Sequence, residues 1–251
     1  SPVVATVVLT VATWIKVWPA ALIAAAVIAL RGRLRIVATA LLASALIMIV
    51  ALTLGSGANV LSFVTQQTGR GLQIEAPVST FWLSQAAAGV PGAFLYDAQQ
   101  ICTLVVNGEG VDVASALMAR SVGLAILVIA LLGVRATRSG VAAGDLLPSL
   151  SLALVTALIA FNKVGSPQFV SWLAVPVVLG LATRAAGHGR SFRTPAIMVL
   201  VIAGLTQFIY PYLYTALLQV QVPMLIVLTG RNAMLFVLLG WAIWSIATAP
   251  R

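Results

Sequence analysis

The chain has 251 residues, of which 61% are hydrophobic and only 8% are charged. Together with a mean hydropathy of +1.11, this composition excludes a soluble domain and predicts a polytopic α-helical membrane protein. The net charge of +9 does not indicate nucleic-acid binding, because the basic residues end apolar runs instead of forming one patch.

Seven apolar segments have roughly the length that a helix needs to cross the hydrocarbon of a membrane. In chain order they are 3–30, 36–55, 114–134, 146–161, 168–183, 195–218 and 229–247. We therefore expect residues 1–251 to form a single all-α integral membrane domain with about seven transmembrane helices.

Three groups of arginines predict the orientation of these helices in a plasma membrane. The groups are Arg31, Arg33 and Arg35, then Arg135 and Arg138, then Arg184, Arg190 and Arg193. Short cytoplasmic loops carry an excess of basic residues, so we place all three groups inside. The N-terminus and residues 57–112, 162–167 and 219–228 then lie outside, and the C-terminus lies in the cytoplasm.

The first apolar segment carries a charge, Lys16, near its middle, and Pro19 follows three residues later. A lysine at the bilayer centre costs about 2.5–3.5 kcal/mol on insertion scales. Pro19 removes a backbone donor, which favours a local break in the helix beside the charge. Lys16 either faces an internal cavity that receives an anionic group or snorkels from the edge of a wrongly drawn span.

The long loop 57–112 contains four of the five acids and begins near a polar stretch, residues 66–75, here called the first polar segment. Aromatic residues recur in the loop between small ones, so interfacial or re-entrant helices fit it better than a free aqueous loop. Within the first polar segment two glycines flank Arg70, and Gln73 stands between Arg70 and Glu75. Arg70 can fork onto a phosphate, and Glu75 is either its ion-pair partner or a base.

Two further cations stand near the predicted outer face. Arg120 lies within two turns of the outer end of the third span, where it either snorkels or faces a cavity. Lys163 belongs to residues 162–169, the second polar segment, in which Pro167 opens the next helix. N–H groups at such a helix start form a natural anion site, with Ser166 or Gln168 completing it; the alternative is a plain connector between helices.

Other kinds of site lack the residues that they need. The chain has one histidine and one cysteine, which argues against a zinc site, a histidine-based triad or an intrachain disulfide. No pair of acids has the spacing of metal ligands. We therefore predict neither a metal nor a cofactor.

Three stretches together resemble the actinobacterial integral-membrane mannosyltransferases of glycosyltransferase family 87. They are residues 14–19 (Trp-Ile-Lys-Val-Trp-Pro), residues 68–75 (Thr-Gly-Arg-Gly-Leu-Gln-Ile-Glu) and residues 162–169 (Asn-Lys-Val-Gly-Ser-Pro-Gln-Phe). The first is similar to the family's Lys-x-x-Pro helix, the second to its Arg-Gly-Leu-Gln-Ile-Glu segment and the third to its Lys-x-x-Ser-Pro-Gln segment.

The resemblance implies a GT-C type enzyme that transfers a hexose, mannose in that family, from a polyprenyl phosphate donor to a glycolipid or glycan at the outer face. The lipid phosphate would bind to the four cations Lys16, Arg70, Arg120 and Lys163. Polar groups of the outer loops, Gln73, Ser166 and Gln168 among them, would contact the sugars. The rival interpretation is a non-catalytic flippase or transporter of lipid-linked sugars.

One departure from the family pattern concerns the catalytic acid. Such enzymes place an essential acid in their first outer loop, whereas residues 1–74 contain no Asp or Glu. We therefore expect the chain to be the C-terminal part of a longer protein. Within the chain, Glu75 is the best remaining general base.

Overall fold

The computed structural model describes residues 2–62, 70–98 and 103–250. The predictions for positions 66–69 of the first polar segment therefore lie outside the described residues. Within those ranges the protein is mainly helical, and six helices are long and apolar enough to cross a membrane. The all-α membrane fold is thus confirmed. The six spans are α3 (Arg33–Thr53), α6 (Val111–Arg138), α7 (Ala143–Ala160), η4 with α8 (Pro167–Leu173, Ala174–Ala185), α9 with η5 (Arg193–Gln207, Phe208–Tyr212) and α11 (Val222–Ala247).

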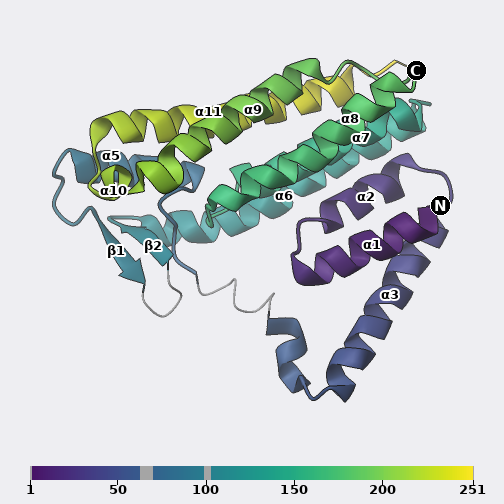
Figure 1. Cartoon of the computed structure of the whole chain (residues 1–251), viewed down its shortest axis with the longest axis horizontal. Helices are drawn as coiled ribbons and strands as arrows, with labels where there is room; N and C mark the ends of the chain where they lie inside the picture. Colours follow the sequence, from purple (N-terminus) through teal and green to yellow (C-terminus); the bar gives the residue numbers. More distant parts are fainter. Residues whose placement is uncertain (1, 63–69, 99–102, 251) are drawn as a thin grey trace.

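The predicted span 3–30 is not one crossing but two short helices, α1 (Pro2–Ile15) and α2 (Ala20–Ala29). They double back on each other, so the N-terminus lies beside the α2–α3 connection (Figure 1). Helices of 14 and 10 residues are about 21 and 15 Å long, well short of the roughly 30 Å hydrocarbon. The physical reason is the break at residues 16–19, where Pro19 follows the charge of Lys16. The predicted position of the N-terminus, outside the membrane, assumed that residues 3–30 cross the membrane once, and it stays a prediction.

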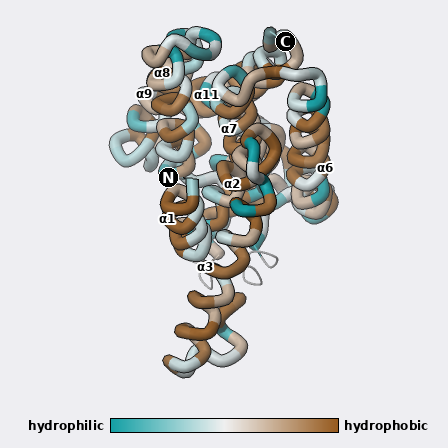
Figure 2. Tube along the Cα trace, turned by 90° about the vertical axis from the view of Figure 1, so that its right-hand side faces the viewer, coloured by the Kyte–Doolittle hydropathy of each residue, from teal (hydrophilic) through white to brown (hydrophobic). Residues whose placement is uncertain are grey.

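Helix α7 forms the centre of the bundle and packs against α2, α6, α8 and α11. Most of its residues are buried in the apolar core, including Leu146, Leu150 and Leu154. Helix α3 instead packs mainly on α1 and extends away from the other helices (Figure 1). Hydrophobic residues run along the helices, and hydrophilic ones gather mainly at helix ends and connections (Figure 2). This is the arrangement of a bundle whose outer surface faces lipid.

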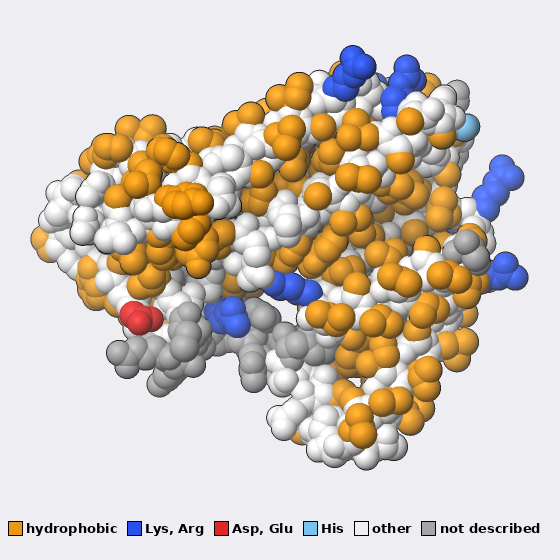
Figure 3. Space-filling view, viewed as in Figure 1, with side chains coloured by type: hydrophobic (Ala, Val, Ile, Leu, Met, Phe, Trp, Pro, Cys, Tyr) orange, Lys and Arg blue, Asp and Glu red, His pale blue; other side chains and the backbone are white. Residues whose placement is uncertain are grey.

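The three connections that carry the arginine groups lie at one end of the bundle, together with the C-terminus (Figure 1). Lysine and arginine side chains stand out there from a largely hydrophobic surface (Figure 3). The prediction that these connections share one face therefore agrees with the structure, and which face is cytoplasmic stays a prediction.

The long loop folds at the opposite end of the bundle and only partly as expected. Its described residues contain η1 (Gly57–Leu61), η2 (Pro77–Ser79) and the short helix α5 (Thr80–Ala87). It also contains a β-hairpin, β1 (Phe94–Ala98) paired antiparallel with β2 (Thr103–Asn107). The hairpin was not predicted, although both strands are rich in the aromatic and β-branched residues that favour strands.

Candidate functional site

The two polar segments, far apart in sequence, are joined through their backbones. The Gln73 N–H donates a hydrogen bond of 3.0 Å to the Lys163 carbonyl oxygen. On its other side the first polar segment pairs with β2, where the Ile74 N–H donates to the Leu104 carbonyl oxygen at 3.2 Å. The turn of the second polar segment packs directly against the backbone that follows the first. The contact is so close that a Cβ added to Gly165 would lie only 2.3 Å from the Ala76 nitrogen. The two segments therefore form one continuous wall.

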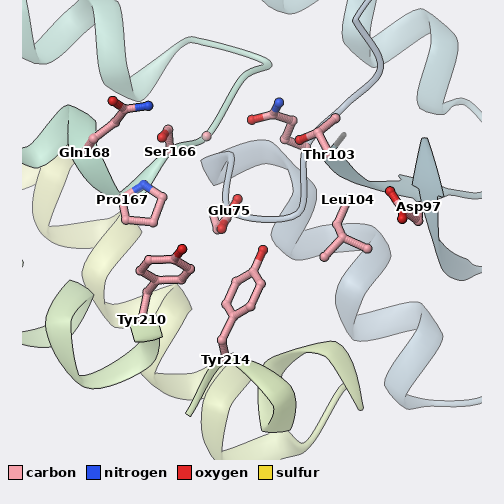
Figure 4. Close-up of a pocket in the computed structure, with 11 residues that line it drawn as sticks. Glu75, Asp97, Thr103, Leu104, Ser166, Pro167, Gln168, Tyr210 and Tyr214 are labelled. Atoms are coloured by element: carbon pink, nitrogen blue, oxygen red, sulfur yellow. The ribbon is translucent and has the colours of Figure 1, made fainter. Parts of the chain in front are cut away.

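A cavity of about 480 Å³ opens on this wall. Four of the predicted site residues line it, namely Gln73, Glu75, Ser166 and Gln168. The other lining residues are Asp97, Thr103 and Leu104 of the hairpin, Gly165 and Pro167 of the second segment, and Tyr210 and Tyr214 beyond α9. In Figure 4 the Tyr210 and Tyr214 hydroxyls point toward the Glu75 carboxylate, whereas Asp97 stands farther off at one edge.

The chemistry of this lining favours a neutral polar ligand over an anion. It offers carboxylate, amide, hydroxyl and aromatic groups, and none of the described residues that line it is a lysine or an arginine. A phosphate inside it would meet two acids without a cation. The described residues also contain no group of three or more possible metal ligands. Hydroxyl-rich molecules are bound by amides, carboxylates and aromatic faces of this kind.

Glu75 is the most strongly perturbed acid of the cavity, with only 8% of its surface exposed. Burial raises the pKa of its carboxyl, while a hydrogen bond from Tyr214 and the charge of Arg231 lower it in part. Burial and the neighbouring Glu75 in turn raise the pKa of Tyr214, so its hydroxyl keeps the proton that it donates. The cation that acts on Glu75 is therefore Arg231 of α11. The pairing with Arg70 that we considered is wrong.

Lys16 reaches the second polar segment from the break between α1 and α2. Its Nζ donates a hydrogen bond of 2.7 Å to Oε1 of Gln168 and lies over the rings of Phe169 and Trp172, 5.6 and 5.7 Å from their centroids. Trp18 stacks on Trp172 at 5.6 Å and fixes the far side of this group. Lys16 does not line the cavity but contacts Gln168, which does, and its role in binding an anionic group stays a prediction.

The other three predicted cations do not line the cavity. Lys163 contributes its carbonyl to the wall, and burial lowers the pKa of its ammonium group. Arg70 is half-buried, and its Nε has no hydrogen-bond partner among the described residues. Arg120 is exposed on α6. Phosphate binding by these three residues stays a prediction.

The ionisable residues of the site that were not predicted are Asp97, Tyr210, Tyr214 and Arg231. Asp97 was noted only as one acid of the long loop. The tyrosines lie near the end of an apolar segment, where anchoring at the membrane interface is a common role, so nothing in the sequence singles them out. Arg231 had a clear signal, since an arginine inside the apolar segment 229–247 is costly and usually functional.

No family model, curated protein or solved structure matches the chain. The family resemblance of the three sequence stretches therefore stays a prediction, and the geometry of the cavity has to carry any functional argument.

Proposed function

We propose that the protein is a membrane glycosyltransferase that transfers a hexose, with mannose as the first sugar to test, from a polyprenyl phosphate donor to a glycolipid or glycan. The observation that carries this proposal is the cavity between the two polar segments, whose described lining has one buried carboxylate, several amide and hydroxyl groups and no lysine or arginine. Such a lining complements the hydroxyls of a sugar ring.

The sugar and the phosphate of the donor occupy different places in this proposal. The hexose lies in the cavity against Gln73 and Tyr210. The phosphate stays at the edge, where Lys16 is already bound to Gln168. A cation placed there stabilises the negative charge that develops on the leaving phosphate. The polyprenyl chain remains in the surrounding lipid.

Glu75 then acts as the general base. An acceptor hydroxyl attacks the anomeric carbon, the bond from that carbon to the phosphate oxygen breaks, and the phosphate leaves with the electron pair. The proton of the acceptor hydroxyl passes to the Glu75 carboxylate. A raised pKa suits this role, because a base works best when its pKa is near the working pH.

The experiment is transfer from a radiolabelled polyprenyl phosphate mannose by the full-length protein in membranes, normalised to folded protein. Glu75→Gln is expected to lose transfer by roughly 10²–10⁴-fold, the usual contribution of a general base. Glu109→Gln is the matched control, since Glu109 is exposed and does not line the cavity. Equal transfer by the two variants would remove Glu75 from the chemistry.

A flippase for lipid-linked sugars is the second candidate, favoured by polar side chains buried within the bundle. Ser149 of α7 and Ser245 of α11 share a buried hydrogen bond of 2.8 Å, and Arg231 and Asn232 are buried in α11. Liposomes that hold the purified protein and a fluorescent polyprenyl phosphate sugar distinguish the two candidates. Translocation without an acceptor favours the flippase, and transfer without translocation favours the enzyme.

A further inference from the structure

Arg231 is an arginine inside a membrane-spanning helix, and its chemistry is not accounted for by its own neighbours. Only 3% of its surface is exposed, and its Nε has no hydrogen-bond partner among the described residues. An ionised group buried in this way is costly unless an opposite charge compensates it. The opposite charge that acts on it is Glu75.

The helix that carries Arg231 packs against elements that adjoin two residues of the cavity, Glu75 and Tyr214. Helix α11 packs against η2 and α5, which follow Glu75 in the chain, and against α10, which begins with Tyr214. Asn232, next to Arg231, donates to the Thr80 hydroxyl at the start of α5 over 3.4 Å. Three elements that surround Glu75 thus meet α11 at this level.

We propose that Arg231 is a positioning residue that holds the Glu75 side chain as a carboxylate directed into the cavity. The proposal rests on the proposed function only for the role of Glu75 as a base. Arg231 itself does not line the cavity, so it acts through Glu75 and not on the ligand.

The physical reason is the opposition between burial and charge at Glu75. Burial favours the neutral acid, and a neutral acid cannot accept a proton. The Arg231 charge and the Tyr214 hydroxyl both favour the carboxylate. Of these two, Tyr214 also sits at the cavity wall, where a ligand can compete for its hydroxyl. Arg231 is shielded from any ligand, so its effect on Glu75 persists throughout a reaction.

Other ionisable groups near Glu75 cannot replace this effect. Tyr210 and Tyr214 face it from η5 and α10, and a tyrosine side chain cannot supply a positive charge (Figure 4). Asp97 lines the same cavity and carries the wrong sign. Lys163 lies in the turn whose backbone meets residues 73–76. We expect Lys163 to stabilise the Glu75 carboxylate less than Arg231 does, because the charge of Arg231, and not that of Lys163, lowers the pKa of Glu75.

The test compares the wild-type protein with Arg231→Met, Arg231→Lys and the control Arg138→Met, since Arg138 is exposed and does not line the cavity. Infrared difference spectra report the protonation of Glu75 through its carboxylic C=O stretch, assigned by its loss in Glu75→Gln. We expect wild-type Glu75 to be ionised at about pH 7, near the working pH of a base. In Arg231→Met its titration should move up by about one pH unit or more, the usual effect of losing a nearby opposite charge. Arg231→Lys should bring the Glu75 titration most of the way back to the wild-type pH, and Arg138→Met should titrate as the wild type does.

The acid limb of kcat/KM for transfer is expected to move with the infrared titration. A merely structural role for Arg231 would reduce the folded yield and leave both curves unmoved, which would overturn the proposal. A wild-type Glu75 that is protonated at about pH 7 would also overturn it, even if Arg231→Met does not fold. An infrared shift in a protein that transfers no sugar would leave the positioning role intact and refute the proposed function.

Discussion

Replacing Gly165 by alanine is expected to force the two polar segments apart and to distort the cavity, although every polar side chain that lines it is kept. The new Cβ would lie 2.3 Å from the Ala76 nitrogen and 2.4 Å from the Glu75 carbonyl carbon. Both are backbone atoms, so no flexible side chain can move away. Ordinary contact begins at 3.4 Å, and the segments would therefore have to separate by about 1 Å, the difference between these distances.

Such overpacking usually costs about 1–3 kcal/mol of folding free energy. The effect on transfer should be larger than this loss of stability suggests, because misplacing a reacting group by about 1 Å can cost roughly 10²-fold in rate. Gly204→Ala is the control, since a Cβ at that position on α9 meets nothing within 4 Å. An alanine in a helix interior is expected to stabilise it by about 0.5–1 kcal/mol.

The assay is unfolding of the purified protein in detergent micelles, followed by transfer per folded molecule in membranes. Gly165→Ala should lower the unfolding midpoint and reduce transfer, and Gly204→Ala should do neither. If Gly165→Ala matched the wild type in both measurements, the two segments would not form a shared wall, and the cavity could not be the site.

Three further predictions concern single contacts. Lys16→Met removes the ammonium group that is bound to Gln168 and that we expect to contact the donor phosphate. Because a hydrogen bond to a charged group contributes about 1.5–3 kcal/mol, the donor KM should rise by roughly 10- to 100-fold. An unchanged KM would place the phosphate elsewhere. A double-mutant cycle of Ser149→Ala and Ser245→Ala should give a coupling of about 0.5–1.5 kcal/mol in unfolding, and additive effects would contradict the bond of 2.8 Å. Because the pKa of Glu75 is raised in the folded protein, the wild type should lose stability relative to Glu75→Gln as the pH rises from its ordinary value of 4.5 through the higher folded value. Melting temperatures over this range test the sign, and a wild type that becomes less stable relative to Glu75→Gln as the pH falls would refute it.

The spans could be predicted where an apolar run has charged or glycine-rich ends, as at α6 and α7. The prediction for the first apolar run was wrong because the hydropathy of a segment does not show where its chain reverses direction. Residues 3–30 are apolar enough to cross once, yet the chain turns at Pro19 and returns. The break was predicted from Lys16 and Pro19, but the angle between the two helices depends on how α1 and α2 pack on α3, α6 and α7.

The candidate site could be predicted only where polar residues cluster in sequence. Gln73, Glu75, Ser166 and Gln168 stood out as polar groups at the borders of apolar runs, and all four line one cavity. Tyr210 and Tyr214 resemble the interfacial tyrosines of many membrane proteins, and only tertiary packing brings their hydroxyls to Glu75 (Figure 4). The sequence offered Arg70 as one candidate partner of Glu75 because it is near in sequence, whereas the charge that lowers the pKa of Glu75 is that of Arg231, more than 150 residues away along the chain.

The most direct test of the central claim is a structure of the protein with a short-chain polyprenyl phosphate mannose bound. We expect the hexose to lie in the cavity between the two polar segments, in contact with Gln73 and Gln168, and the phosphate to lie at its edge beside Lys16. A phosphate inside the cavity next to Glu75, or a sugar bound at a different place on the bundle, would contradict the account.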